Sequence, residues 1–215
     1  MTPANPFPIA RVAALCLALT TAWSAHAQGT GTTGATGAGM SSSFGSDGYS
    51  VLPYTRSGYV GLNLGKPNWR TDCAPGFNCD DGNVSVYLYT GGLINDVLGV
   101  ELGYVNTGSA DRNGGSVRGQ GVNLSLVARV PLGPFNVFAK AGGLYGQTRV
   151  SADMASGMAT GTERGWGGAY AAGAGYDITP QSGVVLEWAR NEFRFPGGGG
   201  RQAVDSVSLG LVRRF

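Results

Sequence analysis

Residues 122–130 read VNLSLVARV, and this stretch decides the fold class. Every second residue from Val122 to Val130 is apolar, whereas the residues between them include Asn123, Ser125 and Arg129. A period of two is typical of a β-strand whose two faces meet different surroundings. The same alternation recurs along the chain and predicts eight strands, at 59–65, 84–89, 99–104, 122–130, 135–147, 166–176, 183–191 and 204–215.

The connections between these strands alternate in length. Long polar connections are expected at 66–82, 107–116, 148–165 and 192–203, and short ones at 93–97, 131–134 and 177–182. Long loops on one side and tight turns on the other are typical of a transmembrane β-barrel. The sequence therefore predicts an all-β fold, an eight-stranded antiparallel up-and-down transmembrane β-barrel over residues 58–215.

The composition favours lipid over water around this barrel. Only 13% of the residues are charged and 38 of the 215 are glycine, whereas about a quarter of a soluble domain is charged. The face of the strands opposite the apolar one carries small residues with scattered charges, such as Gly99, Glu101 and Gly103. Because an eight-stranded barrel has only enough interior space for side chains, this face suits a tight polar lumen.

The first 27 residues have the features of a secretory signal peptide. Arg11 precedes an apolar run at 12–22, and the small residues Ala25 and Ala27 mark a cleavage site before Gln28. The following Gly/Thr/Ser-rich segment, 28–57, is expected to be a flexible tail and lead-in to the barrel.

Removal of this segment also narrows the possible functions. The only histidine, His26, leaves with the signal peptide, and histidine is the usual general base or metal ligand near neutral pH. We therefore expect no enzyme activity, no cofactor and no metal site. The net charge of +2 provides no broad positive field, so nucleic acid is not an expected partner either.

Several segments together resemble a known family. They are GYVGLNLG (58–65), GVELGYVNTG (99–108), GAGYDITPQSGVVLEWAR (173–190) and VSLGLVRRF (207–215). In order and spacing they are similar to the eight-stranded outer-membrane barrels of the OmpA transmembrane-domain and opacity-protein type. The resemblance implies a monomer in the outer membrane of a Gram-negative cell, in contact with outer-membrane lipid and lipopolysaccharide.

The resemblance also bears on function. It implies a non-enzymatic structural or adhesin-like protein whose long extracellular loops meet host or environmental surface molecules. A narrow, low-conductance pore is the alternative. A lipid A-modifying membrane enzyme is a remote third candidate. It is disfavoured because such enzymes use a histidine with a serine, and the chain without its signal peptide has no histidine.

The last strand carries a further similarity. Val207, Leu209, Leu211 and the final Phe215 share one face, and such a strand resembles the signal that the outer-membrane insertion machinery recognises. Arg213 departs from that pattern, which usually has an apolar or aromatic residue at this position.

Four charged residues fall on the lumen face by their parity: Glu101, Arg129, Lys140 and Glu187. An unpaired charge in a narrow lumen would be costly, so these residues are expected to form one buried ion-pair network. The network is either a static polar core or a gate. Arg190 has the opposite parity, beside Trp188, and is expected near the headgroups of the membrane.

Cys73 and Cys79 lie in the first long connection. They are the only thiols left in a chain exported through an oxidising compartment, which predicts a disulfide between them. A metal site is the alternative, but two thiols without histidine leave a structural zinc site incomplete.

Overall fold

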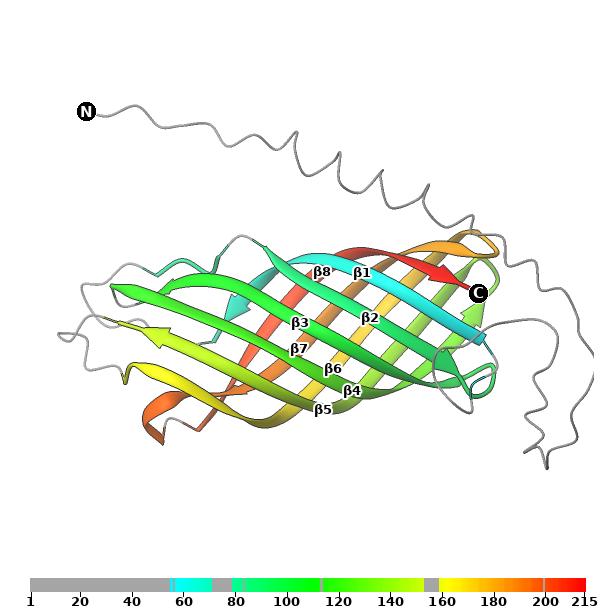
Figure 1. Cartoon of the computed structure of the whole chain (residues 1–215). Coiled ribbons are helices and arrows are strands. Elements are labelled where there is room, and N and C mark those ends of the chain that lie inside the picture. Colours follow the sequence, from blue (N-terminus) through cyan, green and yellow to red (C-terminus); the bar gives the residue numbers. More distant parts are fainter. Residues whose placement is uncertain are drawn as a thin grey trace, which may run out of the picture. The chain divides into compact units, whose positions relative to one another are not determined.

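The computed structural model describes residues 55, 57–70, 79–82, 84–112, 114–152, 159–198 and 200–215. Within them the chain forms a closed barrel in which each strand pairs antiparallel with its sequence neighbours and β8 pairs with β1 (Figure 1). The strands are β1 (Ser57–Trp69), β2 (Ser85–Leu93), β3 (Leu98–Arg112), β4 (Gly115–Leu132), β5 (Phe135–Ser151), β6 (Gly161–Thr179), β7 (Ser182–Arg194) and β8 (Arg201–Arg214).

The predicted all-β eight-stranded barrel is confirmed, but the expected strand lengths were too short. Residues 107–116, expected as a long loop, lie almost entirely in β3 and β4, with a register shift between Asn106 and Ser109 and a turn at Gly114. Half of the expected loop at 192–203 is likewise strand, with the end of β7 and the start of β8 on either side of a short 3-10 helix, η2 (Pro196–Gly198). Among the described residues, no helix is both long and apolar enough to cross a membrane.

The barrel has two different ends. At the turn end, short connections at 94–97, 133–134 and 180–181 join the strands. The strand ends that lead into the β1–β2, β3–β4, β5–β6 and β7–β8 connections all lie at the opposite end, here called the loop end (Figure 1). At the turn end the seam between the first and last strands closes through Gly58 and Phe215, whose backbone N–H groups donate to each other's carbonyl oxygens at 3.1 and 3.0 Å.

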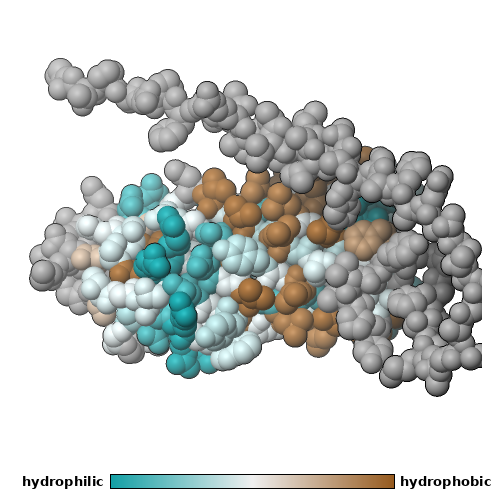
Figure 2. Space-filling view, in the orientation of Figure 1, coloured by the Kyte–Doolittle hydropathy of each residue, from teal (hydrophilic) through white to brown (hydrophobic). Residues whose placement is uncertain are grey.

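The outer face of the wall carries an apolar band. Its large side chains are exposed, as at Leu126 (67%), Leu209 (64%) and Trp166 (64%). Figure 2 shows a brown, hydrophobic zone on the surface of the barrel beside a hydrophilic one. Aromatic residues mark both edges of the band: Tyr104, Tyr145, Trp166 and Trp188 toward the loop end, and Phe135 and Tyr176 toward the turn end. An outward apolar band between two aromatic girdles is the surface of a barrel that sits in lipid.

Glycines on the inner face make room for large lumen side chains. A Cβ atom at Gly61 would overlap the ring of Tyr89, which lies opposite it on β2, and one at Gly91 would overlap the ring of Tyr59. Packing of the lumen therefore requires glycines on the inner face, because the narrow interior accepts a tyrosine only where the neighbouring strand has no side chain.

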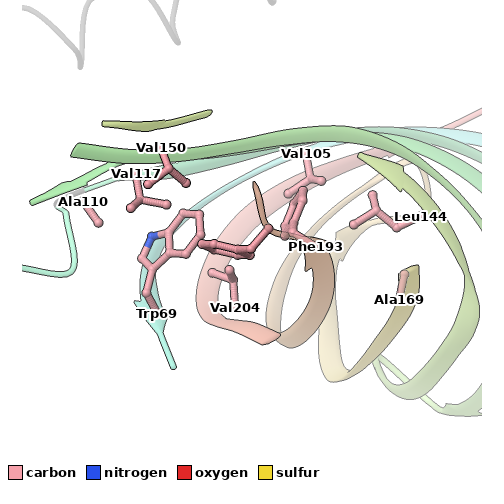
Figure 3. Packing of buried hydrophobic residues seen from close by; sticks show 10 residues of the cluster. Trp69, Val105, Ala110, Val117, Leu144, Val150, Ala169, Phe193 and Val204 are labelled. Atoms are coloured by element: carbon pink, nitrogen blue, oxygen red, sulfur yellow. The ribbon is translucent and has the colours of Figure 1, made fainter. Parts of the chain in front are cut away.

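The loop-end half of the lumen is filled by an apolar cluster. Trp69 stacks on Phe193 with ring centroids 6.4 Å apart and meets Phe195 edge-on at 6.1 Å, and Leu144 beside them is fully buried (Figure 3). Here the polarity of the wall is inverted, with apolar side chains inside and polar ones outside. The cluster, which we call the apolar plug, comprises Trp69, Val105, Ala110, Val117, Leu144, Val150, Ala169, Phe193, Phe195 and Val204.

Candidate functional site

The centre of the lumen is occupied by one lysine held between two glutamates. Lys140 of β5 places its Nζ atom 2.7 Å from Oε1 of Glu101 on β3 and 2.7 Å from Oε2 of Glu187 on β7. All three side chains are buried, with exposed fractions of 7%, 1% and 2%. We call these three residues the lysine clamp.

Tyrosines complete the surroundings of Glu101. The hydroxyl of Tyr59 donates to Oε2 at 2.9 Å, and that of Tyr87 donates to Oε1 at 2.8 Å. Sequence parity did not single out these two tyrosines, because both are uncharged and the expected lumen network comprised charged residues only. The sequence feature that could have identified them is the glycines of the neighbouring strands, which leave room for a large side chain in the lumen. Glu101 is therefore held by three donors.

Aromatic rings also enclose the ammonium group. The Nζ atom of Lys140 lies 4.6 Å from the ring centroid of Tyr89 and 5.0 Å from that of Phe138. Ring faces attract a desolvated cation, so these contacts add to the ion pairs. The lysine clamp still carries two carboxylates and one ammonium, and the excess negative charge makes Lys140 indispensable to it.

Arg129, expected in the same network, lies in a separate one. Its Nη2 atom is 3.4 Å from Oδ2 of Asp177, and Nη2 of Arg214 is 2.7 Å from Oδ1 of the same carboxylate. Asp177 follows the last lumen-facing glycines of β6, and Arg214 ends β8, so this second network lies at the turn end. Parity placed Arg129 on the correct face, but it does not fix the height of a residue along a barrel of tilted strands.

The two networks use different sets of strands. The lysine clamp draws on β3, β5 and β7, whereas Arg129, Asp177 and Arg214 come from β4, β6 and β8. In a barrel, the inward residues of alternate strands lie in common layers. The lumen is thus a stack: a charged layer at the turn end, the lysine clamp in the middle and the apolar plug toward the loop end.

Two small hollows flank the lysine clamp. One, of about 60 Å³, reaches toward the turn end and is lined by Glu101, Arg129 and Arg214 among others. The second, of about 30 Å³, is lined by Glu187, Asn123 and Asn191 among others. Lys140 lines both, so its side chain separates them.

On the outer face, Arg190 is neutralised within the protein. Its Nε atom donates to Oδ1 of Asp205 at 2.7 Å, and Nε of Arg70 donates to the other oxygen at 2.6 Å. The guanidinium of Arg190 lies 5.4 Å from the ring centroid of Trp188, at the loop-end edge of the apolar band. The position beside Trp188 agrees with the parity, and the carboxylate partner is the feature that the sequence did not reveal.

The remaining predicted residues fall in two groups. Val207, Leu209 and Leu211 are exposed on the outer face of β8, and Phe215 pairs with Gly58. Arg213 donates to Gln181 and Ser182 at the turn end. Outside the described residues lie the predicted cleavage site (Ala25, Ala27 and Gln28) and Cys73, so the disulfide between Cys73 and Cys79 stays a prediction.

A family model described as the OmpA-like transmembrane domain matches residues 53–215, the whole barrel. The chain belongs to this family. The predicted resemblance is thereby confirmed, and the closed eight-stranded wall of this OmpA-like chain is that of an outer-membrane β-barrel.

Solved structures with the same fold agree with this OmpA-like assignment. The attachment invasion locus protein Ail of Yersinia pestis is 14% identical, with 74% of this chain and 98% of that chain covered and a TM-score of 0.51. Neisserial surface protein A is 13% identical, with 74% and 96% covered and a TM-score of 0.55. None of the curated proteins compared with the chain matches it.

Proposed function

We propose that this protein is a closed, non-conducting outer-membrane barrel that acts through its loop end on molecules outside the cell. One observation carries the proposal: the lumen is obstructed at two levels, by the lysine clamp and by the apolar plug. Two independent obstructions favour a structural or surface-interaction role over transport.

The two obstructions exclude ions for different reasons. At the lysine clamp, an ion would have to separate contacts of 2.7 Å between buried charges, which leaves a buried charge without its partner. At the apolar plug, an ion would lose its hydration without any polar group to replace it, because Phe193 and Leu144 leave almost no exposed surface there.

A narrow pore is the second candidate, and the two hollows beside Lys140 favour it. If the side chain of Lys140 turned aside, the hollows lined by Glu101 and Glu187 would join. The joined space would still end at the apolar plug, which is why we rank the pore second.

Planar-bilayer recordings of refolded protein separate the two candidates. The wild-type protein and Lys140→Ala are both expected to show no conductance steps, because the apolar plug remains in place in each. Steps in the wild-type protein would overturn the proposal of a closed barrel. Steps that appear only in Lys140→Ala would make the lysine clamp a gate and put the pore first.

The surface role rests on the orientation that membrane barrels share, with short turns in the periplasm and longer connections outside. We propose export by the signal segment 1–27, cleavage before Gln28, and recognition of β8 by the insertion machinery. The two similar solved structures are of proteins named as an attachment protein and a surface protein, in line with a role at the cell surface. We assign the protein no catalytic role.

Cysteine labelling on intact cells tests the orientation. Ala159→Cys places a thiol on an exposed residue at the loop end, and Asp96→Cys places one on an exposed residue at the turn end as its matched control. A membrane-impermeant maleimide is expected to label the first variant and to label the second only after lysis. The reverse pattern would reject the proposed orientation.

A further inference from the structure

Three arginines lie close together on the outer wall, just past the apolar band at the loop end. Arg118 of β4 lies directly opposite Arg149 of β5, and Arg164 of β6 lies opposite Gln147, one step nearer the band. All three side chains are exposed. We call Arg118, Arg149 and Arg164, with Gln120 and Gln147, the arginine patch. Figure 2 shows a hydrophilic zone beside the brown band on this wall.

Among the residues that the structure describes, no carboxylate forms an ion pair with the three arginines of the arginine patch. Like charges directly opposite each other on neighbouring strands are destabilising. On the other side of the barrel, Arg190 and Arg70 share Asp205. Within the described part of the chain, Arg118 and Arg149 make no ion pair and no side-chain hydrogen bond. The repulsion between them is therefore uncompensated unless an anion lies there.

The space between the two arginines suits an anion. A hollow of about 70 Å³ is lined by Arg118, Gln120, Gln147 and Arg149. The side-chain carbonyl of Gln120 accepts a hydrogen bond from Tyr104 at 3.3 Å, and that of Gln147 accepts one from Arg164 at 3.0 Å. With these oxygens engaged, the two amides offer the hollow their NH₂ groups, and guanidinium groups have only donors.

The position of the hollow identifies the source of the anion. One row closer to the membrane centre, the same strands carry Val122, Tyr145 and Trp166, which lie side by side in the register. The rings of Tyr145 and Trp166 are 5.3 Å apart on the outer face, and such aromatic residues lie at the headgroup level of a membrane. An anion just above them on a lipid-facing wall belongs to a lipid headgroup.

We propose that the arginine patch is a binding site for a phosphate group of a phosphorylated glycolipid in the outer leaflet. Arg118 and Arg149 hold the phosphate from both sides of the hollow, Gln120 and Gln147 donate to its oxygens, and Arg164 adds a third positive charge. The proposal goes beyond the proposed function, since it concerns neither the lumen nor the loops, and it rests on the proposed orientation, which places the loop end at the outer leaflet.

Native mass spectrometry of the refolded full barrel in zwitterionic detergent, titrated with lipid A, tests the site. A charge-assisted hydrogen bond corresponds to about a tenfold change in affinity. Arg118→Gln and Arg149→Gln are therefore each expected to weaken lipid A binding about tenfold. Arg190→Gln is the matched control, because it removes an equal charge at the same edge of the band. It is expected to leave binding unchanged.

Stability gives a second readout. The change in urea midpoint caused by Arg118→Gln is expected to have opposite signs in the absence and in the presence of lipid A. In purely zwitterionic detergent, Arg118→Gln relieves the repulsion from Arg149 and is expected to raise the urea midpoint. With lipid A present, the same variant is expected to lower the midpoint relative to wild type, because the bound phosphate links the two strands. A purely structural role of Arg118 would give the same sign in both media and would overturn the proposal.

Three further outcomes would also overturn it. Equal weakening by Arg190→Gln would mean that diffuse charge attracts the lipid. Unchanged binding of lipid A from which both phosphates have been removed would exclude the phosphate as the recognised group. Binding of inorganic phosphate as tight as that of lipid A would show that the site has no preference for a lipid. None of these results bears on conductance, so the proposed closed barrel stands or falls separately.

Discussion

Removal of the lysine from the lumen is the most direct test of how the barrel centre is held together. Lys140→Ala leaves Glu101 and Glu187 charged, buried and without their shared cation. Breaking a buried ion pair by removing one partner costs about 3 to 5 kcal/mol. We expect the free energy of unfolding to fall by this amount, because the side chains of both carboxylates are at most 2% exposed.

The structure also predicts which second substitution rescues the variant. Glu101 keeps the hydroxyls of Tyr59 and Tyr87, and each hydrogen bond to a charged group contributes about 1.5 to 3 kcal/mol. Glu187 has no comparable hydroxyl donor within the described part of the chain. Adding Glu187→Gln to Lys140→Ala should therefore recover more stability than adding Glu101→Gln.

Urea unfolding in detergent micelles, followed by circular dichroism and by the gel mobility of unheated samples, measures these differences. Arg129→Ala combined with Glu187→Gln is the control, because the two residues lie in separate networks. Their effects should add to within about 0.5 kcal/mol. Additive effects of Lys140→Ala and Glu187→Gln would refute the lysine clamp, and a larger rescue by Glu101→Gln would refute the assigned role of the tyrosines.

Three further predictions address the packing and the loop end. Gly61→Ala should lower the free energy of unfolding by about 1 to 3 kcal/mol, because its Cβ atom would overlap the ring of Tyr89, whereas Gly143→Ala, whose nearest new contact is 3.8 Å away, should leave the urea midpoint nearly unchanged. Phe193→Ala should cost about 3 to 5 kcal/mol in the same assay, since the ring is 1% exposed at the centre of the apolar plug, and a loss below 1 kcal/mol would mean that the plug is loosely packed. The exported protein should weigh about 2 Da less than its dithiol form, from the bond between Cys73 and Cys79, and complete reaction of both thiols with a maleimide under native, non-reducing conditions would reject that bond.

The sequence predicted which residues face the lipid and which face the lumen better than it predicted where the strands end. The alternation in 122–130 identified both faces of β4, because membrane lipid and a narrow lumen impose opposite demands on successive residues. Past Val122 the outward residues become polar, as at Gln120 and Arg118, and they resemble a loop even though the backbone is still paired. The strands therefore continue beyond the point where hydropathy stops marking them.

The apolar plug was missed for a related reason. Along β7, Glu187 and Phe193 both point inward, whereas Trp188 and Arg190 point outward. The apolar positions thus change parity within one strand as it leaves the lipid. That change of parity is the signal by which the plug could have been found, because a barrel end surrounded by water needs an apolar interior like any soluble protein.

The charged layers of the lumen have a consequence for assembly. Backbone hydrogen bonds join only adjacent strands, whereas the lysine clamp joins β3, β5 and β7, which never touch in a flat sheet. With neighbouring strands about 4.8 Å apart, alternate strands lie nearly 10 Å apart until the sheet curls. The contacts of Lys140 at 2.7 Å on both sides are therefore available only to a curved wall. A nascent sheet that fails to bend keeps three unpaired charges facing lipid. The energetic cost of these charges favours closure of the barrel before the strands insert fully into the bilayer.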